Sequence, residues 1–273
     1  MEYVYPQAAL DAFFTRVAAT PYRALLLDYD GTLAPFRSAR DQAFPYPGVR
    51  ALLHTLITAG QTRVIVVSGR SIADLERLLG VDPLPELWGS HGWERRLPDG
   101  TYRAFELSPR ATEGLRAARQ VAVMHGFDTL LESKPTSLAL HWRGLAPTAM
   151  QALRVEIGEL WTPIALHYRL AVHPFDGGLE LQIPSHNKGT AVQTVLDELD
   201  PATTLAYLGD DLTDEDAFRT IGHRGLRILV RPEPRLTAAD LWLRPPDDLL
   251  AFLRRWADLD APAALLTGRE EVP

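Results

Sequence analysis

One segment, residues 23–33, constrains the fold of this 273-residue chain more than any other. Its apolar run ends abruptly in Asp28 and Asp30, and Gly31 follows as a turn former, which is typical of a buried strand and its exit turn. Side chains alternate along a strand, so the two carboxylates leave on the same side of the sheet's carboxyl edge, where open α/β sheets bind ligands. Neighbouring carboxylates repel one another unless a cation joins them or one takes up a proton. The pair therefore predicts a metal site, a proton-transfer role, or both.

The overall composition excludes several classes of function. A formal net charge of −7 gives no basic footprint for nucleic acid, and an anionic substrate would need local cations. The chain has no cysteine, which excludes disulfides and thiolate chemistry. No apolar run approaches the roughly 18 residues of a membrane span, and the N-terminus lacks the pattern of a secretory leader. We therefore expect a cytoplasmic protein with neither a nucleic-acid nor a membrane partner.

Strand-like and helix-like segments alternate along most of the chain. Predicted strands at 24–28, 63–67, 204–208 and 227–230 alternate with predicted helices at 49–59, 72–79 and 215–219. This order indicates an α/β fold with a doubly wound, Rossmann-like parallel sheet. The middle of the chain does not follow this regular alternation of strands and helices. Its pattern predicts a hairpin turn at 97–102, helices at 111–125 and 147–161, and strands at 136–142 and 165–172. We predict a core from residues 1–104 and 179–273, with an inserted α+β cap at 105–178.

Four short motifs become informative when they are taken together. They are Asp28-x-Asp30-Gly31-Thr32, Ser68-Gly69-Arg70, Lys188-Gly189, and Gly209-Asp210-Asp211-Leu212-Thr213-Asp214-Glu215. Each is weak alone, but three of them end apolar runs, and their order resembles that of phosphatases of the haloacid dehalogenase superfamily. The last motif is similar to that of the trehalose-6-phosphate phosphatases in particular. The resemblance extends over about residues 23–230.

The residues also suit phosphoryl transfer on chemical grounds. An aspartate has an ordinary pKa of about 3.9, so Asp28 is expected to be an ionised nucleophile that needs no base. Asp30 is placed to protonate the departing sugar oxygen and later to take a proton from the hydrolysing water. Lys188 would counter charge on the phosphoryl group, and the Ser68 hydroxyl with nearby backbone N–H groups would hold its oxygens. The resemblance implies the same roles for Asp28 and Asp30.

Carboxylate oxygens are ligands suited to Mg²⁺, and Asp28 and Asp210 supply them. The resemblance adds the backbone carbonyl of Asp30 as a third ligand. We expect Asp211 and Asp214 to hold metal-bound waters or to orient Lys188.

Specificity for the sugar must come from the insertion, because the core motifs serve many phosphate esters. The segments that resemble sugar-contacting parts of the family give the predicted substrate-binding set, together with two residues of the phosphate loop: Gly69, Arg70, His91, Gly92, Glu132, Lys134, His141, Arg143 and Glu180. Two features depart from the family pattern. Gln182 and Ile183 stand where the family often has a basic residue and proline, and His186-Asn187 precedes Lys188 in place of an acidic residue.

Structural roles compete with several of these assignments. Asp30 could be only a turn former, and Ser68 could be only a helix N-cap. Thr213 and Asp216 resemble a capping box that starts the helix at 215–219. Glu132 and Lys134 could form a solvated salt bridge, while His91, His141 and Arg143 could be scaffold.

The resemblance implies a Mg²⁺-dependent phosphatase that converts the sugar phosphate trehalose 6-phosphate into trehalose and phosphate through an aspartyl-phosphate. Alternatives within the superfamily are phosphatases of sucrose phosphate or mannosylglycerate phosphate, and a phosphomutase fits less well. A non-catalytic sugar-phosphate sensor would keep the fold but lose catalytic residues that this chain retains. A response-regulator receiver lacks both the second aspartate and a cap. We expect a monomer that works alongside a trehalose-6-phosphate synthase.

Overall fold

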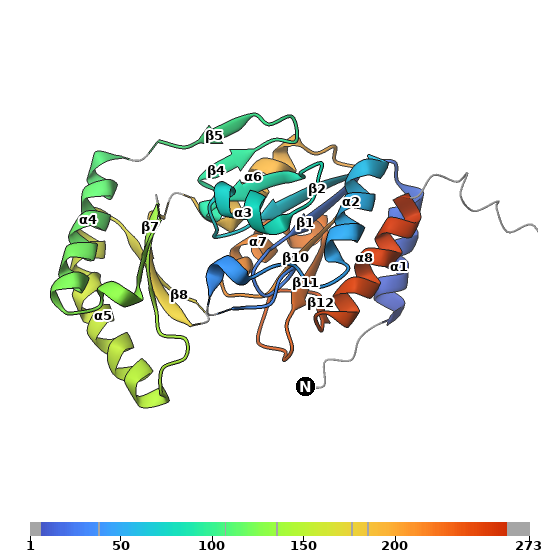
Figure 1. Cartoon of the computed structure of the whole chain (residues 1–273). Helices are drawn as coiled ribbons and strands as arrows, with labels where there is room; N and C mark the ends of the chain where they lie inside the picture. Colours follow the sequence, from blue (N-terminus) through green and yellow to red (C-terminus); the bar gives the residue numbers. More distant parts are fainter. Residues whose placement is uncertain are drawn as a thin grey trace, which may run out of the picture.

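The computed structural model describes residues 7–37, 39–106, 108–134, 136–175, 177–184 and 186–260. Figure 1 shows two adjoining parts, a large sheet with its helices and a smaller sheet backed by α4 and α5. We call the first part the core and the second the cap. Among the described residues, no helix has both the length and the apolar character that crossing a membrane requires.

The core is built on a mainly parallel sheet with the strand order β12-β11-β10-β1-β2-β3-β4-β5. β4 and β5 are antiparallel and form the predicted hairpin at one edge. The strands of the core are β1 Arg23–Leu27, β2 Thr62–Val67, β3 Glu86–Gly89, β4 Glu94–Arg96, β5 Tyr102–Ala104, β10 Thr204–Gly209, β11 Leu226–Val230 and β12 Leu241–Leu243. The predicted α/β fold with a doubly wound parallel sheet is confirmed.

Helices cover both faces of this sheet because its central strands are apolar on both sides. Along β1, Leu25 and Leu27 pack with α1, α2, α3 and α8, whereas Ala24 and Leu26 pack with α6 and α7. The helices are α1 Gln7–Ala19, α2 Val49–Ala59, α3 Ile72–Leu79, α6 Lys188–Glu198, α7 Asp214–Ile221 and α8 Asp247–Asp260, with short 3-10 turns at Arg40–Gln42 (η1), Ser90–Gly92 (η2) and Gly222–Arg224 (η4). The predicted helices at 49–59 and 72–79 are confirmed residue for residue.

The cap is a four-stranded antiparallel sheet in the order β6-β7-β9-β8, with α4 and α5 packed against it. Its elements are α4 Pro109–Met124, η3 Asp128–Leu130, β6 Leu131–Ser133, β7 Ser137–His141, α5 Pro147–Tyr168, β8 Ala171–Phe175 and β9 Gly178–Gln182. The predicted boundary at residue 178 is too early, because β9 pairs with β7 and β8 in the cap sheet. An alternating Leu-Glu-Leu-Gln run fits either sheet, so the pattern alone could not decide its partners.

The predicted strand at 165–172 is also wrong in its first half. α5 continues past Pro163 to Tyr168, and the strand β8 starts only at Ala171. The buried Trp161 explains the extension, since its indole N–H donates to the Ala118 carbonyl of α4 at 3.3 Å and Ala165 is buried one turn later. Packing on α4 therefore stabilises the helix beyond the proline.

Candidate functional site

The three central strands of the core deliver their polar ends to one place. Asp28 follows β1, Ser68 follows β2 and Asp210 follows β10, and β1 pairs in parallel with both neighbours. All three side chains are buried, with relative exposures of 3%, 1% and 1%. The predicted meeting of these motifs at the carboxyl edge of the sheet is therefore what the fold produces.

Lys188 enters this edge from the first residue of α6. The helix begins with a capping box in which the Asn187 side chain accepts from the backbone N–H of Thr190, so the start of the helix is fixed. The Lys188 ammonium donates to Asp28 Oδ1 at 2.6 Å and to Asp214 Oδ1 at 2.8 Å. Burial opposes its charge, but these two carboxylates raise the pKa of Lys188 above its ordinary value. Lys188 is therefore a charged group beside the predicted nucleophile.

Asp214 orients Lys188, as one of its two predicted roles requires. Its Oδ1 also accepts from the Tyr207 hydroxyl at 2.5 Å, and its Oδ2 accepts from the backbone N–H groups of Asp210 and Asp211 at 3.1 and 3.0 Å. With both oxygens occupied, Asp214 is a poor metal ligand even though it lies in the acidic cluster. The predicted capping box at Thr213 does not form, because its side chain makes no cap hydrogen bond.

Asp210, unlike Asp214, has carboxylate oxygens that are available to a metal ion. Neither of its buried carboxylate oxygens has a hydrogen-bond partner within the described part of the chain. Oxygen atoms of Asp28, Asp210 and Asp214 lie within 4.8 Å of one another. Gly31 permits this approach, since its φ is +81° and a Cβ there would lie 2.2 Å from Asp210 Oδ2.

The charge balance of this cluster fits a divalent cation. Burial raises the pKa of Asp28 to about 7 despite the attraction of Lys188, and burial with the Asp28 carboxylate raises the pKa of Asp210 well above its usual range. Burial thus opposes the ionisation expected of Asp28, and Lys188 favours it. A cation bound by Asp28 and Asp210 would restore both negative charges and would give the two Asp210 oxygens a partner.

Two arginines brace the loop that carries Asp210, which the sequence did not reveal. The Arg235 guanidinium donates to the carbonyls of Asp211 at 2.7 Å and Asp210 at 3.3 Å, and Arg231 donates to the Asp210 carbonyl at 3.2 Å. Arg235 is itself held by the buried carboxylate of Glu215, 2.5 Å away. These contacts fix the backbone of Asp210, whose carboxylate oxygens have no hydrogen-bond partner among the described residues.

Asp30 forms an ion pair with Arg70, which the sequence did not predict. Arg70 Nε and Nη2 donate to the two Asp30 carboxylate oxygens at 2.7 Å each, a bidentate pair. Arg70 is 3% exposed and also lines the cavity of the site, so its predicted contact with substrate stays a prediction beside this ion pair. Ser68 accepts from the Arg70 backbone N–H at 3.2 Å, and the actual cap of α3 is Ser71, so the N-cap alternative for Ser68 is wrong.

Glu180 is the centre of the cap side of the site. Its buried carboxylate accepts from Ser137 at 2.6 Å and from Lys134 at 2.8 Å, and it lies 3.2 Å from His91 Nε2. Burial alone would raise the pKa of Glu180, but Lys134 and His91 hold it well below its ordinary value. The sequence left open a salt bridge between Glu132 and Lys134. In the structure Lys134 pairs with Glu180 instead.

His91 reaches Glu180 from a strained turn of the core. Ser90 and His91 have φ angles of +49° and +57°, which are uncommon for residues with a Cβ. Gly69 allows the imidazole to pass, because a Cβ at that position would lie 2.5 Å from His91 Nε2. Gly92, expected beside the substrate, packs on α6, where a Cβ would lie 3.1 Å from the Cβ of Ala191.

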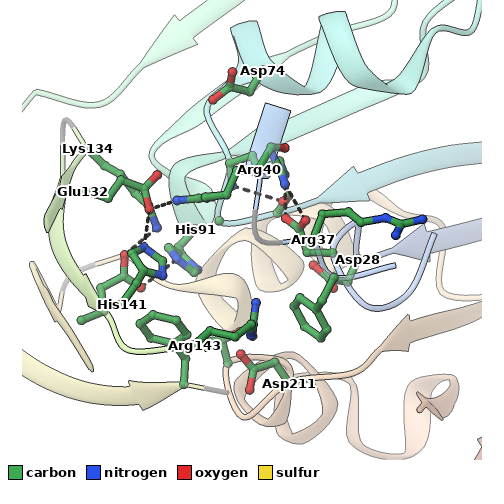
Figure 2. Close-up of a pocket in the computed structure, with 18 of the residues that line it drawn as sticks. Asp28, Arg37, Arg40, Asp74, His91, Glu132, Lys134, His141, Arg143 and Asp211 are labelled. Atoms are coloured by element: carbon green, nitrogen blue, oxygen red, sulfur yellow. Dashed lines mark hydrogen bonds and ion pairs between the residues drawn. The ribbon is translucent and has the colours of Figure 1, made fainter. Parts of the chain in front are cut away.

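Two further contacts join core and cap across the cleft. Glu132 pairs with Arg40 of the core and lies 2.8 Å from His141 Nε2, and Arg143 stacks over the ring of Phe36 with 4.4 Å to the centroid. Burial, with Arg40 and Lys134, lowers the pKa of His141 to about 4. Figure 2 shows Arg40 extending from the core toward Glu132 and His141. Arg40 and Phe36 carry no motif, and sequence reasoning missed both.

One cavity of about 560 Å³ contains both halves of the site. Asp28, Ser68, Lys188 and Asp210 lie on the core side, and Glu132, Lys134, His141, Arg143 and Glu180 on the cap side. The chain has two lysines in all, Lys134 and Lys188, and both line this cavity. The volume is that of a small-molecule site, and its cations suit an anionic ligand in a chain of net charge −7.

Comparison with known proteins identifies the family of this chain. The family model described as trehalose-phosphatase matches residues 26–240. A trehalose-phosphate phosphatase of Mycobacterium marinum is 34% identical over 253 residues, covering 87% of this chain and 62% of that protein. The chain thus spans about three fifths of the length of the curated relatives it matches.

Solved structures share the fold. The C-terminal domain of a C. albicans trehalose-6-phosphate phosphatase superposes with a TM-score of 0.80 at 22% identity, covering 94% of this chain and 99% of that one. The C-terminal domain of a Candida albicans trehalose synthase regulatory protein gives a TM-score of 0.68 at 14% identity, covering 90% and 97%. At these identities the likeness concerns the fold alone. The family match over most of the chain goes further: the chain belongs to the trehalose-phosphatase family.

Proposed function

We propose that this chain is a phosphatase that hydrolyses trehalose 6-phosphate to trehalose and phosphate through an aspartyl-phosphate on Asp28. One observation carries the proposal: the buried Lys188–Asp28 pair, 2.6 Å apart, shares one cavity with the Glu180–Lys134 pair of the cap. The first pair suits a phosphoryl group, and the second offers charged donors and acceptors to sugar hydroxyls. Membership in the trehalose-phosphatase family supports the choice of sugar.

In the first step, an Asp28 oxygen attacks phosphorus and the bond to the sugar oxygen breaks. Lys188 holds a positive charge next to the phosphoryl oxygens, and Ser68 can hold another of them. Asp30 supplies a proton to the departing sugar oxygen. In the second step, Asp30 takes a proton from the attacking water, and phosphate leaves Asp28. Both Asp30 oxygens accept hydrogen bonds from the Arg70 guanidinium. At least one of these hydrogen bonds must break before Asp30 can exchange these protons.

We assign a Mg²⁺ ion to the acidic cluster on the charge and hydrogen-bond balance described above. Asp28 and Asp210 would hold it with their carboxylates and Asp30 with its backbone carbonyl. When bound, the ion supplies positive charge to the phosphoryl oxygens. Asp211 lines the same cavity and is placed for a metal-bound water, while Asp214 keeps Lys188 in position.

The sugar would lie against the cap, in contact with Glu132, Lys134, His141, Arg143 and Glu180, with His91 below it. The residues that depart from the family pattern are not among the described residues that line the main cavity. Ile183 is buried, and Gln182 and Asn187 line a second, smaller cavity to which His91 and Lys188 also contribute. We therefore keep trehalose 6-phosphate ahead of sucrose phosphate and mannosylglycerate phosphate.

A non-catalytic regulator remains the alternative from another class, because one neighbour in fold is the domain of a trehalose synthase regulatory protein. The complete set of Asp28, Asp30, Lys188 and Asp210 favours an enzyme. We also propose that the chain acts in the cytoplasm, as a monomer, beside a trehalose-6-phosphate synthase.

The test is phosphate release from a panel of sugar phosphates, with Mg²⁺ and with a chelator. We expect trehalose 6-phosphate to dominate and the chelator to abolish turnover. Equal rates on all esters would contradict the sugar assignment. Binding of trehalose 6-phosphate without phosphate release would favour the regulator.

A further inference from the structure

A single core segment, residues 34–37 and 39–43, makes two of the core–cap contacts described above, and His91 makes the third with Glu180. The segment follows directly after the Asp28-x-Asp30 turn and contributes Phe36 to the contact with Arg143 and Arg40 to the contact with Glu132. Figure 2 shows Arg40 between the catalytic aspartate and the cap residues. The cap is thus attached to the core at the edge of the catalytic turn.

The segment is anchored to the core at both ends. At its start, Gly31 N–H donates to the Ala34 carbonyl at 2.7 Å; at its end, the Tyr29 hydroxyl donates to the Ala43 carbonyl at 2.8 Å. Between them, the Arg40 carbonyl accepts from Arg70 Nη1 at 2.9 Å, and Arg70 is buried. Arg40 therefore projects from a fixed backbone toward the side chains of the cap.

Arg40 is the cation that matches Glu132. His141 also contacts Glu132, at 2.8 Å, but its pKa of about 4 leaves it uncharged at neutral pH. Lys134 is engaged with Glu180. An arginine from the core thus balances the charge of a carboxylate that belongs to the cap and faces the proposed sugar position.

The pair closes the cleft without filling it. The cavity of about 560 Å³ is present while Arg40 contacts Glu132, and both residues line its wall. A ligand-sized space therefore coexists with the closed contact. Opening the pair would remove one of the contacts that hold the phosphate half of the site next to the sugar half, beside His91–Glu180 and Arg143–Phe36.

We propose that Arg40 is a positioning residue for the sugar half of the site: it holds Glu132, and with it the cap, in the closed arrangement that binds a sugar phosphate. We call the pair the Arg40–Glu132 latch. The inference rests on the proposed function in that Glu132 is taken to face the sugar. It predicts that Arg40 affects binding of a substrate that reaches the cap and leaves chemistry on a small phosphate ester unchanged.

The kinetic test compares trehalose 6-phosphate with p-nitrophenyl phosphate, which lacks a sugar. Arg40→Met should raise KM for the sugar phosphate by about fivefold or more, the effect of losing one partly exposed ion pair, with kcat and the aryl phosphate kinetics unchanged. Arg40→Lys should restore much of the loss, because it keeps the charge. Arg116→Met, which removes an exposed arginine of α4 that pairs with Glu113, is the matched control and should change neither substrate. An unchanged KM ratio in Arg40→Met would overturn the proposal.

A second measurement follows the cap without any substrate. The chain has no cysteine, so Ala51→Cys on α2 and Ala152→Cys on α5, both exposed, give two unique spin-label sites. The parent should show one main core–cap distance, which Arg40→Met and Glu132→Gln should lengthen or broaden and Arg116→Met should not. The same distances in all four proteins would overturn the latch.

The two proposals fail separately. If the distances respond to Arg40→Met but trehalose 6-phosphate releases no phosphate, the proposed function is wrong and the latch stands. If trehalose 6-phosphate turns over and the distances ignore Arg40, the latch is wrong and the function stands.

Discussion

The ammonium of Lys188 lies 2.6 Å from Asp28 Oδ1, although the two residues are 160 positions apart in the chain. The parallel pairing of β1 with β10 and the capped start of α6 bring them together. Both groups are almost fully buried, and Asp214 completes the set from the start of α7. The buried lysine is thus the fixed positive charge next to which the buried carboxylates of Asp28 and Asp214 lie.

Replacing Lys188 with methionine should remove most of the activity. The methionine keeps an unbranched side chain as far as Cε but leaves Asp28 and Asp214 without their cation. We expect kcat to fall by about 10²–10³, the usual effect of losing one charge-stabilising group. Phosphate-release kinetics measure this, with circular dichroism to confirm the fold. A folded variant with more than a tenth of the native kcat would contradict the role of Lys188.

Changing Arg235 to alanine should weaken binding of a divalent cation. The guanidinium holds the carbonyls of Asp210 and Asp211, so its loss frees the loop that carries the Asp210 carboxylate. We expect the Kd for Mn²⁺, followed by its electron paramagnetic resonance signal, to rise about tenfold, equivalent to about 1.4 kcal/mol. Arg219→Ala on the exposed face of α7 is the control and should leave the Kd unchanged. Equal affinities in both variants would show that the brace does not position Asp210.

His141 should remain neutral down to unusually low pH. Its folded pKa is about 4, below the value of about 6.5 expected for the unfolded chain, so between these values the unfolded state binds the extra proton. This contribution to stability is complete above about pH 6.5 and is lost as the pH falls toward 4. Imidazole chemical shifts in an NMR titration measure the pKa. In His141→Gln, the free energy of unfolding should depend less on pH across this window.

Glu180→Gln should affect both stability and selectivity. The amide keeps the size of the side chain but cannot balance Lys134, which is left beside a neutral, buried group. We expect a loss of about 1–3 kcal/mol in the free energy of unfolding, as for other buried groups that lose a partner, and a raised KM for trehalose 6-phosphate. Glu156→Gln on the exposed face of α5 is the control for both readouts. A native KM in Glu180→Gln would remove Glu180 from the sugar-binding set.

Local pattern was sufficient to predict the elements that bring the core of the site together. Apolar runs ending in Asp28, Ser68 and Asp210 had no other reasonable place than the carboxyl edge of a parallel sheet. Helices such as α2 and α3 begin and end at glycine or serine signals in the sequence, so their bounds were predictable. These features depend on residues close to one another in the chain.

Features that depend on distant partners were not predictable. β9 belongs to the cap sheet because it pairs with β7. The helix α5 continues beyond Pro163 because Trp161 packs on α4. The ion pair of Arg70 with Asp30 was not predicted either, since nothing local shows that this side chain turns back to Asp30. Arg40 belongs to no motif, and its ion pair with Glu132 depends on the folded position of the cap.

Trapping the covalent intermediate tests the central claim most directly. The native enzyme would be mixed with trehalose 6-phosphate and Mg²⁺, quenched in acid within one turnover and digested for mass spectrometry. We predict a phosphoryl group on the peptide that contains Asp28, absent from Asp28→Asn and from the reaction without substrate. Rapid phosphate release with no labelled Asp28 peptide at any quench time, or undiminished release by Asp28→Asn, would contradict the account.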